Sequence, residues 1–305
     1  MIRSIFLTGA GGFLGSRVLA RLAEERNLRT VCLLRGTPPA AAAPNVEYVR
    51  GDLLEPAGYA AALAGCDAVL HLAAATGKHP AAEYFRVNRD GTAALARQAR
   101  ESGVARFLLV STVAAKFPGQ YRYYYAQSKQ AAEAALAASG LRWTIVRPAM
   151  ILGRNAPVLE SLARLAALPV VPVFGNGRVP VQPVFVDDLA ACLVALLGEA
   201  DLFENTTLEI GGPEVLTIEQ LILRIRRTKG SAAAPVLHLP AGAIARCLGW
   251  MEPFLLPWLP FTAGQLASFC NAGTTASHPR VTEWQKRMKD VDEMLRSVAN
   301  GYASA

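Results

Sequence analysis

The residues best suited to chemistry lie in the stretch YYYAQSK, where three tyrosines precede a lysine. On a helix residues i and i+4 share a face, so Tyr125 would lie over Lys129, with Tyr124 and Tyr123 turned about 140° and 240° away. An ammonium beside a phenol favours the ionised phenolate and lowers a pKa that is ordinarily about 10. The spacing predicts that Tyr125 is a proton donor, with Tyr124 as the substitute if the helix begins one residue early.

A glycine-rich loop, TGAGGFLG, separates a short apolar run from a helical pattern. Its spacing GxxGxxG allows a tight turn, close approach of the backbone to a ligand, and close packing of the helix on the strand. The amino end of the helix favours negative charge. The loop is therefore expected to bind the pyrophosphate of a dinucleotide. The residues expected at this site are Gly9, Gly11, Gly12, Phe13, Leu14 and Gly15.

The position that would select the adenosine ribose holds an arginine. A cofactor bound through its ribose 2′-hydroxyl usually meets an acid ~20 residues after the glycines. Arg35 stands there instead, and no Asp or Glu occurs between Arg26 and Glu47. Because a guanidinium pairs well with phosphate oxygens, the sequence predicts NADP(H) as the preferred cofactor, with NAD(H) as the alternative.

Short apolar strands alternate with longer helical patterns in the first half of the chain. The expected strands are residues 2–8, 30–34, 46–50, 68–72, 106–111 and 144–147, and the expected helices are residues 14–26, 56–64, 83–102 and 125–138. Each parallel crossover needs a helix-sized connection, so this alternation predicts an α/β fold with a Rossmann-type doubly wound parallel sheet.

The alternation loosens after residue 148. Residues 1–149 and 184–211 are assigned to an NAD(P)-binding Rossmann domain, and residues 150–183 and 212–305 to a smaller C-terminal α/β substrate lobe. Thr217 is expected to cap the helix IEQLILRIRRTK. The basic runs RIRRTK and WQKRMK are interpreted as solvated helix faces. The late aromatics are interpreted as core residues or, if they line a pocket, as walls for a lipophilic substrate. They are Trp250, Phe254, Trp258 and Phe261.

Eight short motifs occur in the order found in extended and atypical short-chain dehydrogenases/reductases. They are TGAGGFLG, GDL, HLAA, VNRDGT, RFLLVST, YAQSK, RPAMILG and VFVDDLA. The resemblance covers residues 1–220, and eight weak motifs in one order are jointly specific. This is the NAD(P)-dependent epimerase/dehydratase superfamily. LRWTIVRPAMILG and LEIGGPEVLTIEQL look most like its atypical group related to the nucleotide-binding accessory subunit of respiratory complex I.

The resemblance implies roles for residues along the cofactor. Asp52 and Leu53 would lie along the adenine, with Asp52 accepting a hydrogen bond from its exocyclic amine. Ala73 and Ala74 would line the path of the ribose and pyrophosphate.

At the nicotinamide end, the resemblance implies that Lys129 hydrogen-bonds the ribose and that Asn88 supports the active-site helices. Pro148, Ala149 and Met150 would face the nicotinamide amide.

A hydroxyl that orients the carbonyl is expected where the strand before the tyrosine helix ends. Aligning RFLLVST with the family places Thr112 at the catalytic position, with Ser111 one residue before it as the alternative. Residues 113–122 lack the VYG continuation usual in epimerases, which disfavours a nucleotide-sugar substrate.

Composition bounds the remaining possibilities. With 52% hydrophobic and 18% charged residues the chain is globular, and its net charge of +7 is scattered, so no nucleic-acid partner is expected. The five cysteines form no C-x-x-C pair and the four histidines have no metal spacing, so no metal is expected. The amino terminus lacks a signal-peptide pattern, which favours a cytoplasmic location.

A membrane partner is expected at most at the protein surface. The apolar stretch 241–261 contains Arg246, Glu252 and several prolines, so it is not expected to span a bilayer, but contact with a membrane surface stays open. The oligomeric state is left as monomer or homodimer.

Three functions follow, in order of preference. The first is an NAD(P)-dependent reductase or dehydrogenase that transfers hydride between NADP(H) and an apolar carbonyl or alcohol, a small-molecule substrate. The second is a nucleotide-sugar epimerase or dehydratase, and the third is a non-catalytic dinucleotide-binding assembly or sensor protein.

Overall fold

The computed structural model describes residues 2–38, 43–256, 258–259 and 261–303. The chain divides into two compact units. The first unit comprises Met1–Ala115, Gln127–Arg147 and Leu189–Leu208, and the second comprises Lys116–Ala126, Pro148–Asp188 and Glu209–Ala305. Which unit binds which part of a ligand stays a prediction.

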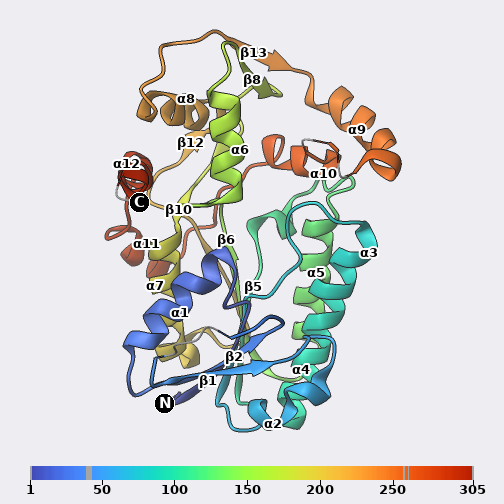
Figure 1. Cartoon of the computed structure of the whole chain (residues 1–305), viewed down its shortest axis with the longest axis vertical. Coiled ribbons are helices and arrows are strands. Elements are labelled where there is room, and N and C mark those ends of the chain that lie inside the picture. The colour runs from blue at the N-terminus through green and yellow to red at the C-terminus, as the bar shows by residue number, and fades with distance from the viewer. Residues whose placement is uncertain (1, 39–42, 257, 260, 304–305) are drawn as a thin grey trace. The chain divides into compact units, whose positions relative to one another are not determined.

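A seven-stranded sheet forms the centre of the first unit, and its last strand continues into the second (Figure 1). In chain order the strands are β1 (Ser4–Thr8), β2 (Arg29–Leu34), β3 (Val46–Arg50), β4 (Ala68–His71), β5 (Arg106–Val110), β6 (Arg142–Pro148) and β11 (Thr206–Ile210). Their order in the sheet is β11-β6-β5-β4-β1-β2-β3, and the pairs from β3 to β6 are parallel. The predicted doubly wound α/β fold is confirmed.

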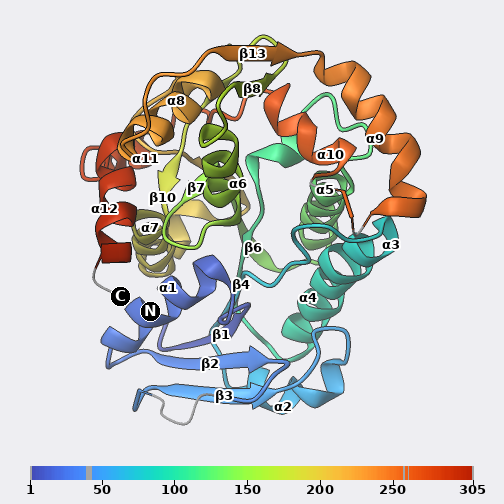
Figure 2. The ribbon, with the colours of Figure 1, turned by 45° about the horizontal axis from the view of Figure 1, so that its top comes forward.

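Helices cover both faces of this sheet. Strand β1 is therefore buried along its whole length. On one face Phe6 and Phe107 pack among apolar residues of α2 (Ala60–Leu63), α4 (Gly91–Glu101) and α5 (Tyr124–Ala137). Figure 2 shows α4 and α5 side by side here, and α1 (Phe13–Glu24) on the other side. A 3₁₀ turn, η1 (Pro56–Gly58), precedes α2, and the turns η3 (Val113–Lys116) and η4 (Ala200–Phe203) follow β5 and α7 (Val186–Gly198).

The helix predicted over residues 83–102 is three segments. The structure has α3 (Ala81–Tyr84), a π-helical turn η2 (Phe85–Asp90) and then α4. A π turn admits one extra residue into a helix and is frequent at functional sites. Immediately after it, a Cβ at Gly91 would lie 2.6 Å from Cδ2 of Leu53, so the glycine allows this close approach. Periodicity alone did not reveal the widened turn.

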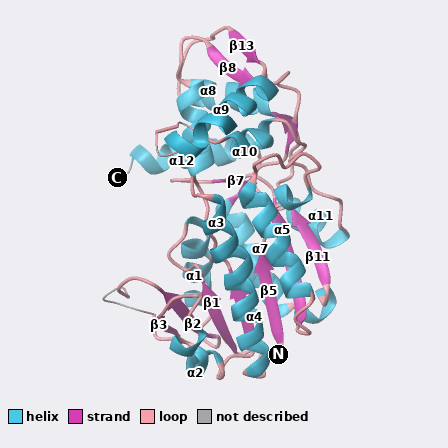
Figure 3. Cartoon of the chain, turned by 90° about the vertical axis from the view of Figure 1, so that its right-hand side faces the viewer, coloured by secondary structure: helices cyan, strands magenta, loops and turns pink. Residues whose placement is uncertain are grey.

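The second unit combines short helices with two-stranded ribbons (Figure 3). The parallel pairs are β7 (Ile151–Leu152) with β10 (Val184–Phe185), and β8 (Val171–Phe174) with β13 (Val236–Leu239); β9 (Pro180–Val181) and β12 (Leu216–Thr217) are antiparallel. The helices are α6 (Pro157–Ala166), α8 (Ile218–Thr228), α9 (Ala241–Leu255), α10 (Ala263–Leu266), α11 (Pro279–Gln285) and α12 (Val291–Ala303), with a 3₁₀ turn η5 (Ala267–Phe269).

Two interpretations of helix α8 have different outcomes. Thr217 caps it in a capping box, in which its hydroxyl accepts from the Gln220 N–H and the Gln220 side chain accepts from the Thr217 N–H. The basic run of this helix is solvated only in part: Arg227 and Lys229 are exposed, whereas Arg224 and Arg226 are half-buried. Arg224 pairs with Glu214 and Asp292, and Arg226 donates to the carbonyl of Ala166. Arg224 and Arg226 therefore bind groups of other segments, and the interpretation as a solvated face holds only for Arg227 and Lys229.

The late aromatics differ from one another. Phe261 packs edge-on against Phe174 in a core cluster with Leu248 and Leu266, as a core interpretation requires. Trp250 and Phe254 lie in the same stretch but are exposed. Interpreting them as core residues was wrong, because the inner face of α9 is filled by other side chains. Within the part of the chain that the structure describes, no helix combines the length and the apolar composition needed to cross a bilayer.

Candidate functional site

The glycine loop and the segment after β4 meet where the strand order of the sheet reverses. Strand β1 has β2 on one side and β4 on the other, so the connections leave in opposite directions, and ligands of open α/β sheets are expected beyond the carboxyl ends of such strands. Gly9 directly follows β1, while Ala73 and Ala74 follow β4 and are half-buried. The predicted loop therefore lies at the point where open α/β sheets bind ligands.

The backbone of this loop is built for glycine at two positions. Gly9 has a φ of +79°, and a Cβ there would lie 2.6 Å from the Ala73 nitrogen. A Cβ at Gly15 would lie 1.9 Å from the carbonyl oxygen of Gly9, which itself accepts from the Gly12 N–H at 3.0 Å. A Cβ at Gly11 would meet nothing within 4 Å. Gly9 and Gly15 thus shape the loop, whereas the structure leaves the space beside Gly11 open.

Helix α1 begins at this loop with free amide donors. Its N-cap is Gly12, which provides no side-chain cap, and its first turn holds no acidic residue. Gly11 and Gly12 are exposed, and Phe13 and Leu14 are half-buried. The first N–H groups of a helix have no partner within the helix and lie at the positive end of its dipole. An anion such as a pyrophosphate would satisfy them.

A buried histidine ties the ends of β1 and β4 to helix α4. The Thr92 hydroxyl donates to the Asn88 carbonyl at 2.6 Å, so its oxygen accepts from Nε2–H of His71 at 3.0 Å. Nδ1 of His71 must then accept from the Thr8 hydroxyl at 2.6 Å, and the Thr8 oxygen accepts from the Ala73 N–H at 3.2 Å. Burial, and after it the charge of Lys129, lowers the pKa of His71 to about 3. The network assigns one neutral tautomer to His71 and fixes the ends of β1 and β4 relative to each other.

Asn88 connects the segment after β4 to the tyrosine helix. Its Oδ1 accepts from the Ala75 N–H at 2.7 Å, and its Nδ2 donates to the Ala75 carbonyl and to the Ser128 hydroxyl at 2.9 Å. Asn88 and Ser128 are both buried, and Asn88 lies in the π turn η2. Because every polar atom of the amide is used within the protein, Asn88 positions its neighbours and has no donor left for a ligand.

Lys129 is a buried ammonium at the carboxyl end of β5. Its side chain is 2% exposed, and Nζ donates to the Val110 carbonyl at 2.7 Å. Burial lowers the pKa of Lys129 to about 8, while the negative charge of Glu133 acts in the opposite direction. At neutral pH the lysine is therefore still mostly charged.

Glu133 lies one helical turn after Lys129 and is held by Arg147. The guanidinium of Arg147 donates to both carboxylate oxygens, at 2.9 and 2.5 Å, and Glu133 is 6% exposed. Such bidentate pairs fix geometry as well as charge. The pair thereby holds a carboxylate in one geometry near the buried ammonium, and the negative charge of Glu133 favours the charged form of Lys129.

Helix α5 begins at Tyr124 and includes both Tyr125 and Lys129. With this start the two residues are one turn apart on one helix, as the spacing predicted. Tyr123 precedes the helix, and its ring centroid lies 6.1 Å from that of Tyr125, so the two rings pack together. The helix begins one residue before the predicted start, the condition under which Tyr124 is the substitute, so Tyr125 as the proton donor, with Tyr124 as the alternative, stays a prediction.

The two candidate hydroxyls after β5 have different surroundings. The Thr112 oxygen accepts from the Ala114 N–H at 3.2 Å, whereas the Ser111 hydroxyl is buried and has no hydrogen-bond partner among the described residues. A buried hydroxyl without a partner costs about 1–3 kcal/mol. Among the described residues, Ser111 therefore has an unused hydrogen bond, and Thr112, which only accepts one, also keeps its donor.

At the adenosine end, the predicted residues are not equivalent. Oδ1 of Asp52 accepts from the Leu54 N–H at 2.9 Å, which orients the carboxylate. Leu53 is buried in the sheet core and its carbonyl accepts from the Tyr59 hydroxyl at 3.0 Å, so its side chain is not available to an adenine. Arg35 is exposed just after β2. Hydrogen bonds from Arg86 and, as the weakest contribution, the charge of Arg35 lower the pKa of Glu83 in α3.

The residues predicted to face the nicotinamide belong to the second unit. The Ala149 N–H donates to the Ile210 carbonyl, and the Met150 carbonyl accepts from the Val184 N–H, both at 2.9 Å. These bonds anchor the chain where it leaves β6 after Pro148. The approach of Pro148, Ala149 and Met150 to a nicotinamide stays a prediction.

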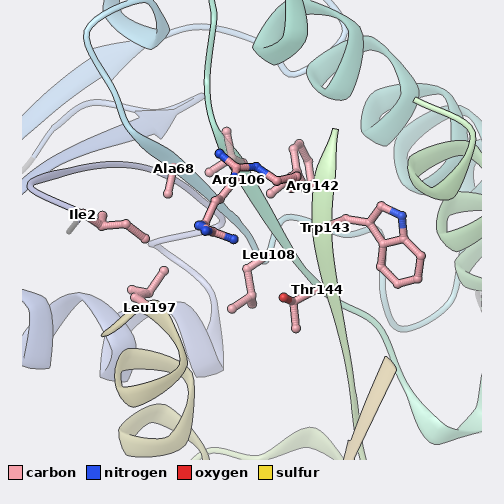
Figure 4. A pocket seen from close by; sticks show the side chains of 10 residues that line it. Ile2, Ala68, Arg106, Leu108, Arg142, Trp143, Thr144 and Leu197 are labelled. Carbon is pink, nitrogen blue, oxygen red and sulfur yellow. The ribbon is translucent and has the colours of Figure 1, made fainter. Parts of the chain in front are cut away.

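A small pocket lies at the other end of the strands, at the amino ends of β4, β5 and β6 (Figure 4). Ala68, Arg106 and Arg142 contribute to its lining. Its volume is about 10 Å³, which is room for no more than one water molecule. It is not a substrate site. Among the described residues no group of three or more His, Cys, Asp or Glu side chains could hold a metal ion.

The glycine loop, the first turn of α1 and the end of β5 fit a dinucleotide. The glycine loop leaves open space beside Gly11, the first turn of α1 has free amides, and the Ser111 hydroxyl lacks a partner. The open space and the free amides suit the pyrophosphate of a ligand, and the Ser111 hydroxyl suits a polar ligand group near the carboxyl end of β5.

Comparison with known proteins agrees with this geometry. Residues 9–170 match a family described as NAD(P)H-binding, and the chain belongs to that family. A solved NAD-dependent NDP-hexosamine 5,6-dehydratase has a similar fold, with a TM-score of 0.72 at 20% identity over 99% of this chain and 98% of its own.

Three relatives illustrate the range of the family. A ceramide reductase of Caulobacter vibrioides is 38% identical over 63% of this chain and 60% of its own length. A 2-alkyl-3-oxoalkanoate reductase of Shewanella oneidensis is 29% identical over 61% of this chain and 54% of its own. A mitochondrial NADH dehydrogenase subunit of Arabidopsis thaliana is 33% identical over 42% and 32%. The chain thus matches about three fifths or less of the length of each of these proteins.

A solved UDP-glucose 4-epimerase of Thermotoga maritima has the same fold. It superimposes with a TM-score of 0.71 over 99% of both chains at 18% identity.

Sequence reasoning missed the residues that hold the predicted site residues in place. His71 and Thr92 lie inside the quoted motifs HLAA and VNRDGT but had no assigned role. Glu133 follows Lys129 at i+4, the spacing that singled out Tyr125, so it could have been found in the same way. Arg147, its partner, comes from a strand, and no helical spacing connects the two.

Alanine substitutions at two glycines should separate loop structure from ligand binding. Gly15→Ala, whose Cβ would overlap the Gly9 carbonyl, should lower the free energy of unfolding of the free protein by roughly 2 kcal/mol or more. Gly11→Ala should leave that stability unchanged but weaken NADPH binding about tenfold, because its methyl group enters the ligand space. Thermal unfolding and fluorescence titration measure the two effects.

The control is Gly58→Ala in η1, where a Cβ meets nothing within 4 Å and both quantities should match wild type. Unchanged NADPH affinity of Gly11→Ala would contradict the proposed ligand path.

The buried ammonium predicts a specific pH dependence of stability. Lys129 has a pKa of about 8 in the folded protein and about 10.4 when unfolded. The unfolded chain therefore binds more protons between these values, and stability rises with pH across this window. Relative to Lys129→Met, which cannot titrate, the wild-type free energy of unfolding should rise by on the order of 3 kcal/mol.

Urea unfolding of both proteins from about pH 7 to about pH 11 measures the difference. Lys229→Met, at an exposed lysine, should show no such change relative to wild type. A wild-type-minus-Lys129→Met difference that is constant with pH would contradict the burial of a titrating ammonium.

Proposed function

We propose that this protein is an NADP(H)-dependent reductase that converts an apolar carbonyl compound to the alcohol, with Tyr125 as the proton donor. The observation that carries the proposal is the buried, charged Lys129 one helical turn from Tyr125, at the carboxyl end of the strand that precedes the helix. A buried ammonium is costly, and a tyrosine acid next to a dinucleotide gives it a use.

The chain's own groups would act as follows. The glycine loop and the first turn of α1 bind the pyrophosphate, and Ser111 or Thr112 donates a hydrogen bond to the substrate carbonyl oxygen. The bound dinucleotide supplies a hydride to the carbonyl carbon. Tyr125 gives its phenolic proton to the developing alkoxide, and the Lys129 ammonium stabilises the phenolate that remains. A proton from solvent then restores Tyr125.

An apolar substrate is supported by two observations. Residues 113–122 lack the epimerase continuation VYG, and the named reductases of Caulobacter and Shewanella act on ceramide and on 2-alkyl-3-oxoalkanoate, both with alkyl chains. We therefore favour a carbonyl on a long-chain lipid over a nucleotide sugar. The likeness to the epimerase is one of fold.

The preference for NADP(H) rests on Arg35. It is exposed just beyond β2, the strand next to the glycine loop strand, and no acid takes the place that would bind a free ribose 2′-hydroxyl. A guanidinium there would pair with a 2′-phosphate.

Phenylalanine substitutions test the acid. Tyr125→Phe should lower kcat for NADPH-dependent ketone reduction by roughly 100-fold or more while leaving the Kd for NADPH within about threefold, because only proton transfer is lost. The substrate is chosen from a panel of long-chain 3-oxo lipids, quinones and sugar nucleotides, and NADPH oxidation is followed at 340 nm.

The matched controls Tyr123→Phe and Tyr124→Phe should keep kcat within about threefold. A large loss in Tyr124→Phe with wild-type activity in Tyr125→Phe would transfer the role to Tyr124. Tight NADPH binding without turnover of any substrate would favour the non-catalytic function.

Arg35→Ala tests the cofactor preference. It should raise the Kd of NADPH about 10- to 100-fold, which corresponds to a lost charge-assisted contact of about 1.4–3 kcal/mol, and leave the Kd of NADH unchanged. The control Arg26→Ala removes an exposed arginine before β2, at the other end of that strand, and should change neither constant. Wild-type protein that binds NADH as tightly as NADPH would refute the preference.

A further inference from the structure

Helix α9 of the second unit is apolar on two faces. Its inner face packs Ala241, Ile244 and Leu248 into the core cluster around Phe174. Its outer face, defined here as Ala243, Arg246, Cys247, Trp250 and Phe254 together with Trp258 just beyond the helix, is exposed. The helix runs along the outer side of its unit (Figure 2). A helix that is apolar all round is normally buried, so the outer face needs a partner.

Three aromatic rings dominate this outer face. Trp250, Phe254 and Trp258 are 78%, 79% and 85% exposed, and each follows the previous one by four residues. The N–H groups of Trp258 and Leu259 donate to the Leu255 carbonyl, which continues the helical turn beyond α9. The rings therefore form one row along the helix.

The charge of the outer face is positive. Glu252, the acidic residue of α9, is turned inward, where Oε1 accepts from the Ala263 N–H at 2.5 Å and Oε2 lies 3.4 Å from the Arg122 guanidinium. Arg246 is exposed. The outer face thus combines aromatic rings with a guanidinium and shows no carboxylate among its defined residues.

The area of the row favours a membrane over a second copy of the chain. Large aromatic side chains bury about 150–250 Å² each, so three rings at these exposures offer on the order of 500 Å². A stable protein interface needs about 800 Å² from each partner, with hydrogen bonds at its rim. A row of Trp and Phe with flanking Arg is instead the composition of segments that lie in the headgroup region of a bilayer.

We propose that the outer face of α9 docks on a phospholipid bilayer that contains anionic lipids. The rings of Trp250, Phe254 and Trp258 enter the headgroup region, and the Arg246 guanidinium pairs with lipid phosphate. This docking is independent of the reaction proposed above, since it requires neither the cofactor nor Tyr125.

Vesicle sedimentation with the full chain tests the docking. Vesicles of phosphatidylcholine and phosphatidylglycerol at about 3:1 should bind wild-type protein, and Trp250→Ser/Phe254→Ser should weaken the binding at least tenfold. Leu202→Ser, at a residue that is 75% exposed in the first unit, is the matched control and should bind as wild type. Thermal unfolding of every variant verifies that the fold is kept.

Arg246→Glu separates the electrostatic part. It should weaken binding to the anionic vesicles and leave binding to pure phosphatidylcholine unchanged. Wild-type protein that stays in the supernatant with anionic vesicles, or a Trp250→Ser/Phe254→Ser variant that binds like wild type, would overturn the proposal. So would a wild-type dimer that this variant dissociates while vesicles capture neither protein, because the occupant would then be a second copy.

Discussion

The burial of the Lys129 ammonium is the constraint on which the site depends. An isolated charge in the interior is strongly unfavourable, so each of its neighbours must be compatible with it. The Val110 carbonyl accepts a hydrogen bond from it, and the carboxylate of Glu133, held by Arg147, supplies the opposite charge. His71 stays neutral beside it because burial and that same charge lower its pKa. A lysine placed at this cost needs a ligand or a reaction to explain it.

The same sheet provides the second requirement, a place for a phosphate-containing ligand. The strand order reverses beside β1, so the glycine loop and the segment after β4 meet at the carboxyl ends of neighbouring strands. Gly9 brings the two backbones together, and the Thr8–His71–Thr92 network locks them. The network also holds α4, whose neighbouring Asn88 reaches Ser128 of α5. The glycine loop and the tyrosine helix are thereby parts of one hydrogen-bonded structure.

Much of this arrangement could be predicted from the sequence because it depends on local patterns. The alternation of apolar runs and helical spacing predicted the sheet, Thr217 was recognised as a cap, and the i+4 spacing identified the Tyr125–Lys129 pair. The remainder depends on contacts between distant segments. The π turn around Asn88 comes from fitting an extra residue into a helix, and periodicity does not record it. Trp250 was assigned to the core by its type, although packing on the inner face of α9 decides its exposure.

Hydride transfer is the central claim, and isotope transfer tests it directly. Wild-type protein is incubated with NADPH carrying deuterium at both C4 positions and a long-chain 3-oxo lipid, and the alcohol product is analysed by mass spectrometry. The account predicts one deuterium on the carbinol carbon of the product. A product without deuterium, or no product from any carbonyl compound despite tight NADPH binding, would contradict it.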